Sequence, residues 1–368
     1  MVHPGRIDEV CWEQVFPWLL LTRAARSALL VSVVVATLLG ALATAVGWTA
    51  IGRIVGVEHA AWPIATEQLE QRVPVAASAA TDILPAADHL RPVVRQNPLA
   101  RAWAVVAGPW LNVLSAEGMQ QRIYLTLCGL WSLAVWGLAG GVIAWVTAVR
   151  VSRREKAPVG AAASRAVKVW LSAIGGPVTT LLAAALLSLP IVVAGWFMRY
   201  EGFAVVVGLA WGLVLLVGLL LAALLLGLLV GWPLMIITAV VDRSDAFDGI
   251  SRALAYVFQR PLHLLWYLLV AGLLAWVVQW GVSVAAEATI AAAERIASVG
   301  AGAARAAELF DEPQSASGWS SWLVEQWRKG IRAGVRWYPF ALFWSLATGV
   351  YLLLRFQIDQ TELDELAE

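Results

Sequence analysis

Three aspartates spaced three residues apart are the first candidates for chemistry in this sequence. Asp242, Asp245 and Asp248 lie in the stretch DRSDAFDGISRALAYVFQRP, which covers residues 242–261. On a helix, carboxylates at positions i, i+3 and i+6 spread over part of a turn and could share one cation. No histidine or fourth carboxylate accompanies them locally, so the pattern falls short of the ligand set that calcium normally takes.

The same stretch also has the pattern of an amphipathic helix. Its large apolar residues fall at positions i, i+3, i+7 and i+10 and form one face, which consists of Phe247, Ile250, Leu254 and Val257. Asp248 and Arg252 lie on the opposite face with the spacing of a helical ion pair. Ser244 or Asp242 is expected to cap the N-terminus, and Pro261 to end the helix. We expect this structural role rather than metal binding, with the apolar face contributing more to stability than the charges.

The composition of the whole chain defines the environment of this helix. The 368 residues are 60% hydrophobic and only 14% charged, whereas an average soluble protein is about 25% charged. Several uninterrupted apolar runs exceed the roughly 20 residues that cross a bilayer, and the 21 tryptophans are typical of membrane–water interfaces. The sequence therefore predicts an all-α, polytopic transmembrane helical bundle with about six spans, interfacial amphipathic helices and an extracytoplasmic helical cap.

The spans and loops follow one another in a definite predicted order. The chain begins with an interfacial segment at 1–26, span 1 at 27–51, an extracytoplasmic helical loop at 52–118, and spans 2 to 4 within 119–241, where a basic cytoplasmic loop occupies 150–170. It continues with the amphipathic cytoplasmic helix at 242–261, span 5 at 262–286, a second extracytoplasmic helical loop at 287–336, span 6 at 337–354, and an acidic cytoplasmic tail at 355–368.

Six spans place both termini on the same side of the membrane. The basic cluster Arg150–Lys156 lies directly after span 2, and such clusters stay in the cytoplasm. We therefore expect both termini to be cytoplasmic in a bacterial cytoplasmic (inner) membrane. We also expect the outer loops to pack on each other as the cap, through Trp62, Trp103, Trp110, Trp319, Trp322 and Trp327.

Glycines and prolines predict where spans bend or pack closely. Gly231 and Pro233, on either side of Trp232, are expected to kink span 4. The Gly-Gly-Pro sequence at 175–177 is expected to end a surface helix before span 3. Three G-x-x-x-G pairs predict close packing of spans 2 and 4, and they lie at 137–141, 208–212 and 227–231.

Charge and motif content exclude several function classes. The net charge of +1 gives no nucleic-acid footprint, and no G-x-S-x-G, Walker A or H-E-x-x-H pattern is present. The apolar interiors of the predicted spans contain no Asp, Glu, Lys or Arg, whereas ion pathways and proton relays usually contain such residues. Gln279 is the one large polar residue deep in a span, and we expect an interhelical hydrogen bond to explain it. We therefore expect no enzyme, no catalytic residue and no cofactor.

Three stretches together carry a resemblance to a known family. They are LCGLWSLAVWGLAGGVIAWVTAVRVSRREK at 127–156, GWPLMIITAVVDRSDAFDGISRALAYVFQRPLHLLWY at 231–267, and YPFALFWSLATGVYLLLRFQIDQTELDEL at 338–366. In this order they resemble a family of integral membrane proteins from planctomycete bacteria. The D-x-x-D-A-x-x-x-x-S-R pattern also resembles the non-catalytic membrane domains of bacterial glycerophosphodiester phosphodiesterases. The resemblance implies a bacterial inner-membrane protein and leaves its activity open.

Two functions from different classes fit this sequence. The first is a non-enzymatic scaffold or assembly subunit, which would bind membrane lipid or partner proteins through its outer loops or cytoplasmic helices, alone or as an oligomer. The alternative is a permease or lipid-handling transport protein without ion-coupling carboxylates, which the break at 231–233 motivates. A polar cavity between spans 3, 4 and 5 would favour the transporter, and a tightly filled bundle with exposed apolar grooves would favour the scaffold.

Overall fold

The computed structural model describes residues 16–57, 97–113, 116, 118–153, 155, 157–311 and 319–360. Every regular element in these ranges is a helix, as the sequence predicts. In chain order the helices are η1 (Pro17–Leu19), α2 (Leu20–Ser27), α3 (Val31–Val55), α7 (Pro98–Val113), α8 (Met119–Ser152), α9 (Val159–Lys168), α10 (Trp170–Phe197), α11 (Glu201–Leu209), α12 (Trp211–Asp242), α13 (Ala246–Gln259), α14 (Pro261–Ala301), α15 (Ala303–Ala306), η2 (Ala307–Asp311) and α16 (Trp319–Ile358).

Six of the described helices are long and apolar enough to cross a membrane. They are α3, α8, α10, α12, α14 and α16. The two longest are α14 with 41 residues and α16 with 40. Each corresponds to roughly 60 Å at the usual helical rise, whereas the hydrocarbon core of a bilayer is roughly 30 Å thick. The six-span helical architecture predicted from composition is confirmed, and the chain is an integral membrane protein by the length and composition of its helices.

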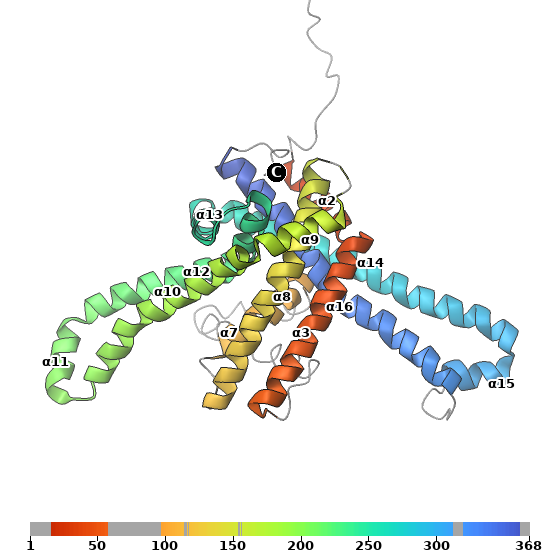
Figure 1. Ribbon diagram of the computed structural model, residues 1–368, viewed down its shortest axis with the longest axis horizontal. Coiled ribbons are helices and arrows are strands. Elements are labelled where there is room, and N and C mark those ends of the chain that lie inside the picture. The colour runs from red at the N-terminus through yellow and green to blue at the C-terminus, as the bar shows by residue number, and fades with distance from the viewer. Residues whose placement is uncertain are drawn as a thin grey trace, which may run out of the picture.

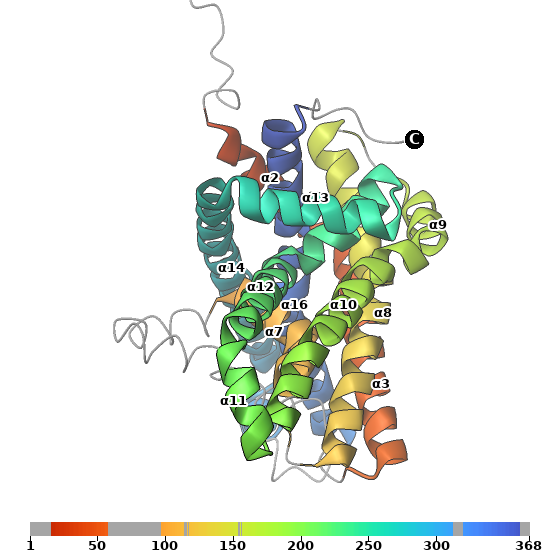
Figure 2. The ribbon, with the colours of Figure 1, turned by 90° about the vertical axis from the view of Figure 1, so that its left-hand side faces the viewer.

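The long helices form three antiparallel pairs that spread apart from one end. Figure 1 shows α3 and α8 in the middle, α10 and α12 on one side with α11 at their tip, and α14 and α16 on the other side with α15 at their tip. The pairs converge where α2, α9, α13 and the last turns of α16 lie, and we call this end the hub. In the view of Figure 2, α13 crosses over the hub ends of the spans. The three tips point away from the hub.

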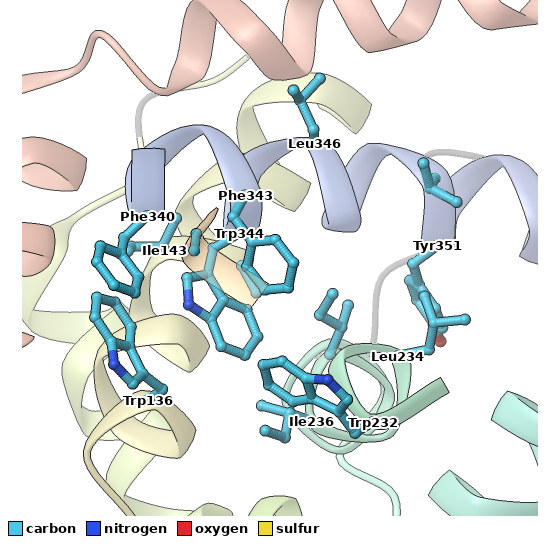
Figure 3. Packing of buried hydrophobic residues seen from close by; sticks show 14 of the residues in the cluster. Trp136, Ile143, Trp232, Leu234, Ile236, Phe340, Phe343, Trp344, Leu346 and Tyr351 are labelled. Carbon is cyan, nitrogen blue, oxygen red and sulfur yellow. The ribbon is translucent and has the colours of Figure 1, made fainter. Parts of the chain in front are cut away.

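An aromatic core joins the pairs just below the hub. Figure 3 shows rings from α8, α12 and α16 turned toward one another. The Trp136 and Phe340 rings stack with their centroids 4.3 Å apart, and Trp232 stacks on Phe343 at 5.7 Å. Trp344 lies between the two groups and is fully buried. Each aromatic pair adds about 0.5–1.5 kcal/mol beyond the burial of its area, so this cluster holds α8, α12 and α16 together.

Glycine allows the closest of these contacts. A Cβ atom on Gly140 of α8 would overlap the Trp344 ring of α16. A Cβ atom on Gly227 of α12 would likewise overlap the side chain of Leu254 in α13. An added Cβ on Gly141 would lie 3.0 Å from Val240 of α12, so the pairs at 137–141 and 227–231 lie at packed interfaces, as predicted. At Gly208 and Gly212 no atom lies within 4 Å of an added Cβ, so the close packing predicted for that pair is wrong in this structure.

Neither of the two glycine–proline sequences ends its helix. The helix predicted to end at 175–177 does not end there, because α10 begins at Trp170 and continues through Pro177. The glycines in that stretch pack closely instead, and an added Cβ on Gly176 would lie 3.2 Å from the Cβ of Met235 in α12. In span 4 the helix α12 continues through Gly231 and Pro233, where a kink was expected, and α11 ends before Ala210. Proline is tolerated within a membrane helix because neighbouring groups satisfy the backbone group that it frees.

The segment expected to form the second outer loop is mostly a continuation of two spans. α14 continues past residue 286 to Ala301, and α16 already begins at Trp319. Of residues 58–118 in the first outer segment, the structure describes 97–113, 116 and 118. The helix α7 in this part packs against α8, α16 and α14. Trp62 and residues 361–368 of the expected tail lie outside the described residues.

Candidate functional site

The polar side chains of the hub gather around Asp242, the last residue of α12. Its side chain is only 8% exposed. Oδ2 accepts hydrogen bonds from Arg252 Nη1 at 2.8 Å and from the Tyr351 hydroxyl at 2.6 Å. Oδ1 lies 3.6 Å from Arg355 Nη1. One carboxylate thus connects α12 to α13 and to α16, and we call these four residues the Asp242 cluster.

The other two aspartates of the candidate metal site have different partners. Asp245 is the N-cap of α13, and its Oδ1 accepts from the Asp248 backbone N–H at 2.8 Å. Asp248 Oδ1 forms the expected ion pair with Arg252 Nε at 3.0 Å. The prediction that Ser244 or Asp242 caps the helix is wrong, because α12 extends through Asp242 and α13 begins only at Ala246. Among the described residues, no three His, Cys, Asp or Glu side chains form a group that could hold a metal ion.

The end of α16 is tied to the hub by two further side-chain contacts. The Tyr256 hydroxyl of α13 donates to Asp359, and Gln357 of α16 donates to the Tyr267 hydroxyl of α14. Burial, reinforced by the hydrogen bond to Asp359, raises the pKa of Tyr256. The phenol therefore stays protonated and donates at neutral pH. The three helices α13, α14 and α16 are thereby held in one register at the hub.

Carboxylates of α12 and α13 keep Arg252 positively charged. Burial on its own would lower the pKa of Arg252, but the hydrogen bond to Asp248 and the charges of Asp248 and Asp242 outweigh burial and raise it. Removing a charge from water is costly unless a counter-charge and hydrogen bonds replace the lost hydration. In this cluster the guanidinium and the carboxylates supply those groups for each other.

A second buried arginine fastens α9 to the end of α12. Arg165 is 5% exposed, and it donates from Nε to the Val240 carbonyl at 2.7 Å and from Nη2 to the Val241 carbonyl at 2.9 Å. These carbonyls belong to the last turn of α12, where helix carbonyls lack an intrahelical partner and the dipole favours a cation. The Arg165 guanidinium also lies 3.8 Å above the Trp145 ring. Burial, together with the nearby Arg243, lowers the pKa of Arg165 to about 10.

Sequence reasoning missed Arg165 because it belongs to the basic stretch 150–170, which was expected to lie on the surface. The missed signal is its position between small residues. Ala162, Arg165 and Ala166 form the buried face of α9, and two alanines at this spacing allow a helix to approach its neighbour closely.

The packed face of α13 is rotated from the predicted one. Its buried residues are Gly249, Ala253, Tyr256 and Val257. Of the predicted apolar face, Val257 is buried, Ile250 and Leu254 are half-buried, and Phe247 is 75% exposed. The rotation has a steric cause, because an added Cβ on Gly249 would lie 3.2 Å from the Met235 carbonyl oxygen of α12. Small residues, rather than large ones, mark the face on which these helices meet.

Helix interfaces also contain three residues that the sequence singled out, namely Gly231, Pro233 and Gln279. Gly231 and Pro233 are buried in α12, and an added Cβ on Gly231 would lie 3.5 Å from the Ala253 Cβ of α13. Gln279 Nε2 donates to the Val335 carbonyl of α16 at 3.1 Å, which confirms the expected interhelical hydrogen bond.

The tryptophans of the two outer segments lie in different surroundings. Trp103 of α7 donates to the Leu229 carbonyl of α12 at 3.0 Å, and Trp110 lies against Gly129 of α8. Trp319, Trp322 and Trp327 are exposed. The described members of the expected six-tryptophan interface therefore divide between the packed bundle and the open surface.

The hub is a junction at which side chains of α12, α13, α14 and α16 bond to one another. In the Asp242 cluster a buried carboxylate of α12 is paired with Arg252 of α13 and Arg355 of α16 and accepts a hydrogen bond from the Tyr351 hydroxyl of α16, so it joins three helices. No protein-family model, curated protein or solved structure matches this chain. The resemblance to the planctomycete membrane proteins and to the phosphodiesterase membrane domains stays an expectation from the sequence.

Proposed function

We propose that this chain is a non-enzymatic scaffold or assembly subunit of a bacterial cytoplasmic membrane, and that it binds a protein or lipid partner through the hub. The observation that carries the proposal is the position of α13. This helix is held by Arg252, Tyr256 and its packed small residues, and it presents Phe247 outward from the fixed helix. A rigid helix that exposes a large aromatic side chain is suited to a constant contact with a partner.

The transport alternative rests on the Gly-Trp-Pro sequence in α12. Transporter sites are typically formed by discontinuous helices that line a cavity. In this chain α12 is continuous at that point, and Trp232 packs against Phe343 and Trp344 in the aromatic core. The feature that motivated a transport function is therefore accounted for by packing, which favours the scaffold.

The sidedness of the hub is part of the proposal. Arg150 and Arg153 end α8 at the hub, and Arg243 and Arg260 flank α13. Basic residues at the ends of spans are typical of the cytoplasmic side. We therefore assign the hub, with both ends of the described chain, to the cytoplasm and the three tips to the outside.

Mild-detergent extraction of the full chain from its native membranes tests the scaffold function. We expect a protein or lipid to co-purify in a fixed ratio with the parent chain, and to be lost from a Phe247→Asp variant whose elution volume and melting temperature are unchanged. Gln259→Ala, at an exposed position of the same helix, is the matched control and should retain the partner.

The transport alternative has its own readout. Solute uptake by liposomes that contain the purified chain alone, together with the absence of any partner in a fixed ratio, would contradict the scaffold function.

A further inference from the structure

The outer half of the α14–α16 pair exposes apolar side chains that a soluble helical hairpin would bury. On α16, residues 319–336 carry a stripe of exposed apolar side chains at helical spacing. The most exposed are Trp319 at 81% and Trp327 at 75%. The complete stripe consists of Trp319, Trp322, Leu323, Trp327 and Ile331.

Two arginines of the same helix pair with glutamates of α14 on the side away from the stripe. The Arg328 side chain is only 12% exposed, and it pairs with Glu294 of α14 and donates to the Phe310 carbonyl at 3.0 Å. Arg332 forms two hydrogen bonds with Glu287 of α14, at 2.9 and 3.0 Å. Arg328 and Arg332 are thus neutralised by glutamates of the neighbouring helix, while the aromatic residues of the stripe are exposed.

Water would favour the opposite arrangement. A surface helix in water buries its apolar stripe and exposes its charges, and a contiguous exposed apolar stripe indicates a contact with a membrane or a partner. Tryptophan in particular accumulates where a bilayer meets water. Arginines that are already paired with glutamates also lose less on leaving water than unpaired ones.

The placement of the hairpin indicates which apolar medium covers the stripe. In Figure 1 the tip at α15 lies at about the same level as α11 and as the ends of α3 and α8 that are distant from the hub. A bilayer crossed by α3 and α8 therefore has its far surface at the level of this tip. Since α14 is far longer than a bilayer is thick, it has to tilt strongly, which places the outer half of the pair along that surface.

We propose that the outer hairpin, formed by residues 287–301 of α14 and 319–336 of α16, is embedded in the headgroup region of the leaflet opposite the hub, with its tryptophan stripe against phospholipid. The hairpin is then a membrane anchor that fixes the tilt of α14 and α16. The proposal requires only that the chain spans a bilayer, so it holds whether the hub binds a partner or not.

Collision measurements with single nitroxide labels test this assignment. The full chain, with Cys11→Ser and Cys128→Ala, is labelled at Trp327→Cys, at Ile331→Cys or at Lys329→Cys and placed in bilayers of phosphatidylcholine and phosphatidylglycerol. Lys329 is the matched control, since it is exposed and lies on the charged side of the same turn. We expect the labels at 327 and 331 to collide mainly with oxygen, which partitions into lipid. They should lose most of the collisions with a water-soluble nickel complex that the label at 329 retains.

Two outcomes would overturn the proposal. Equal access of the nickel complex to all three labels would show that the stripe faces water. Dipolar broadening between labels at 327, which disappears on dilution with unlabelled chain, would show that a second copy covers the stripe. Both stripe positions are exposed, and Ile331→Cys is a small change, so the reading at 331 is obtained even if the variant at 327 is poorly folded.

Discussion

At the scale of single residues, Asp242 is the position at which charge matters most. The sequence places it in a row of three similar aspartates, and the structure gives the three different surroundings. Asp242 is buried among arginines, Asp245 caps a helix, and Asp248 is part of a half-exposed ion pair. The expectation that charges contribute little to stability therefore applies to Asp248 and not to Asp242.

Substitution of these two aspartates should have unequal effects on stability. Asp242→Asn leaves Arg252 and Arg355 without their shared counter-charge, and breaking a buried ion pair costs about 3–5 kcal/mol. Asp248→Asn removes a half-exposed pair and should cost under about 1 kcal/mol. Denaturation of the purified chain in detergent measures both. Equal losses would contradict the predicted difference between the two aspartates. A stabilisation of the parent chain by divalent cations that either variant abolishes would restore the metal hypothesis.

Arg165 should tolerate no other cation. Arg165→Lys keeps the charge but cannot donate to both carbonyls of α12 or stack flat on Trp145, and we expect a loss of about 1.5–3 kcal/mol, the usual contribution of a hydrogen bond to a charged group. Lys168→Ala, at an exposed position of the same helix, serves as the control in the same melting experiment. A wild-type melting temperature for Arg165→Lys would show that the buried guanidinium does not fasten α9.

At the scale of elements, hydrophobicity predicts the helices and steric fit decides where they end and meet. The six spans follow from apolar runs that only helices can place in a bilayer. The local breakers at 175–177 and 231–233 do not end their helices, because the same glycines let α10, α12 and α13 approach one another. The packed face of α13 was missed for the same reason, since a pattern of large residues does not reveal a contact made through Gly249 and Ala253. Such contacts depend on which helices become neighbours, and periodicity alone does not contain that information.

Two glycines in long helices should respond oppositely to alanine. Gly140→Ala forces a methyl group into the Trp344 ring, and overpacking of this kind costs about 1–3 kcal/mol. Gly218→Ala in α12 meets no atom within 4 Å and should be neutral, or stabilising by up to about 1 kcal/mol through helix propensity. Thermal denaturation in detergent distinguishes the two variants. A neutral Gly140→Ala would contradict the close packing of α8 on α16.

At the scale of the whole molecule, burial is concentrated at the hub and in the aromatic core. α16 is mostly buried within its apolar window, whereas α10, α12 and α14 expose most of theirs. A chain in water would not leave three long apolar helices uncovered, but lipid covers such surfaces without cost. The spread of the three pairs from one junction is therefore compatible with a bilayer and with a hub that fixes their angles.

We expect the hub and the three tips to lie on opposite sides of one membrane, joined by six crossings. Labelling with a membrane-impermeant maleimide tests this arrangement in full chains that carry Cys11→Ser and Cys128→Ala. One new cysteine is placed at Phe247 in the hub, at Tyr200 near the α11 tip, or at Met119 at the far end of α8. All three positions are exposed. Because we propose that the hub is cytoplasmic, we expect cysteines at 200 and 119 to react on intact cells and a cysteine at 247 to react only after the membrane is opened. Reaction of 247 from the same side as 200 or 119 would contradict the six-span arrangement and the junction built on it.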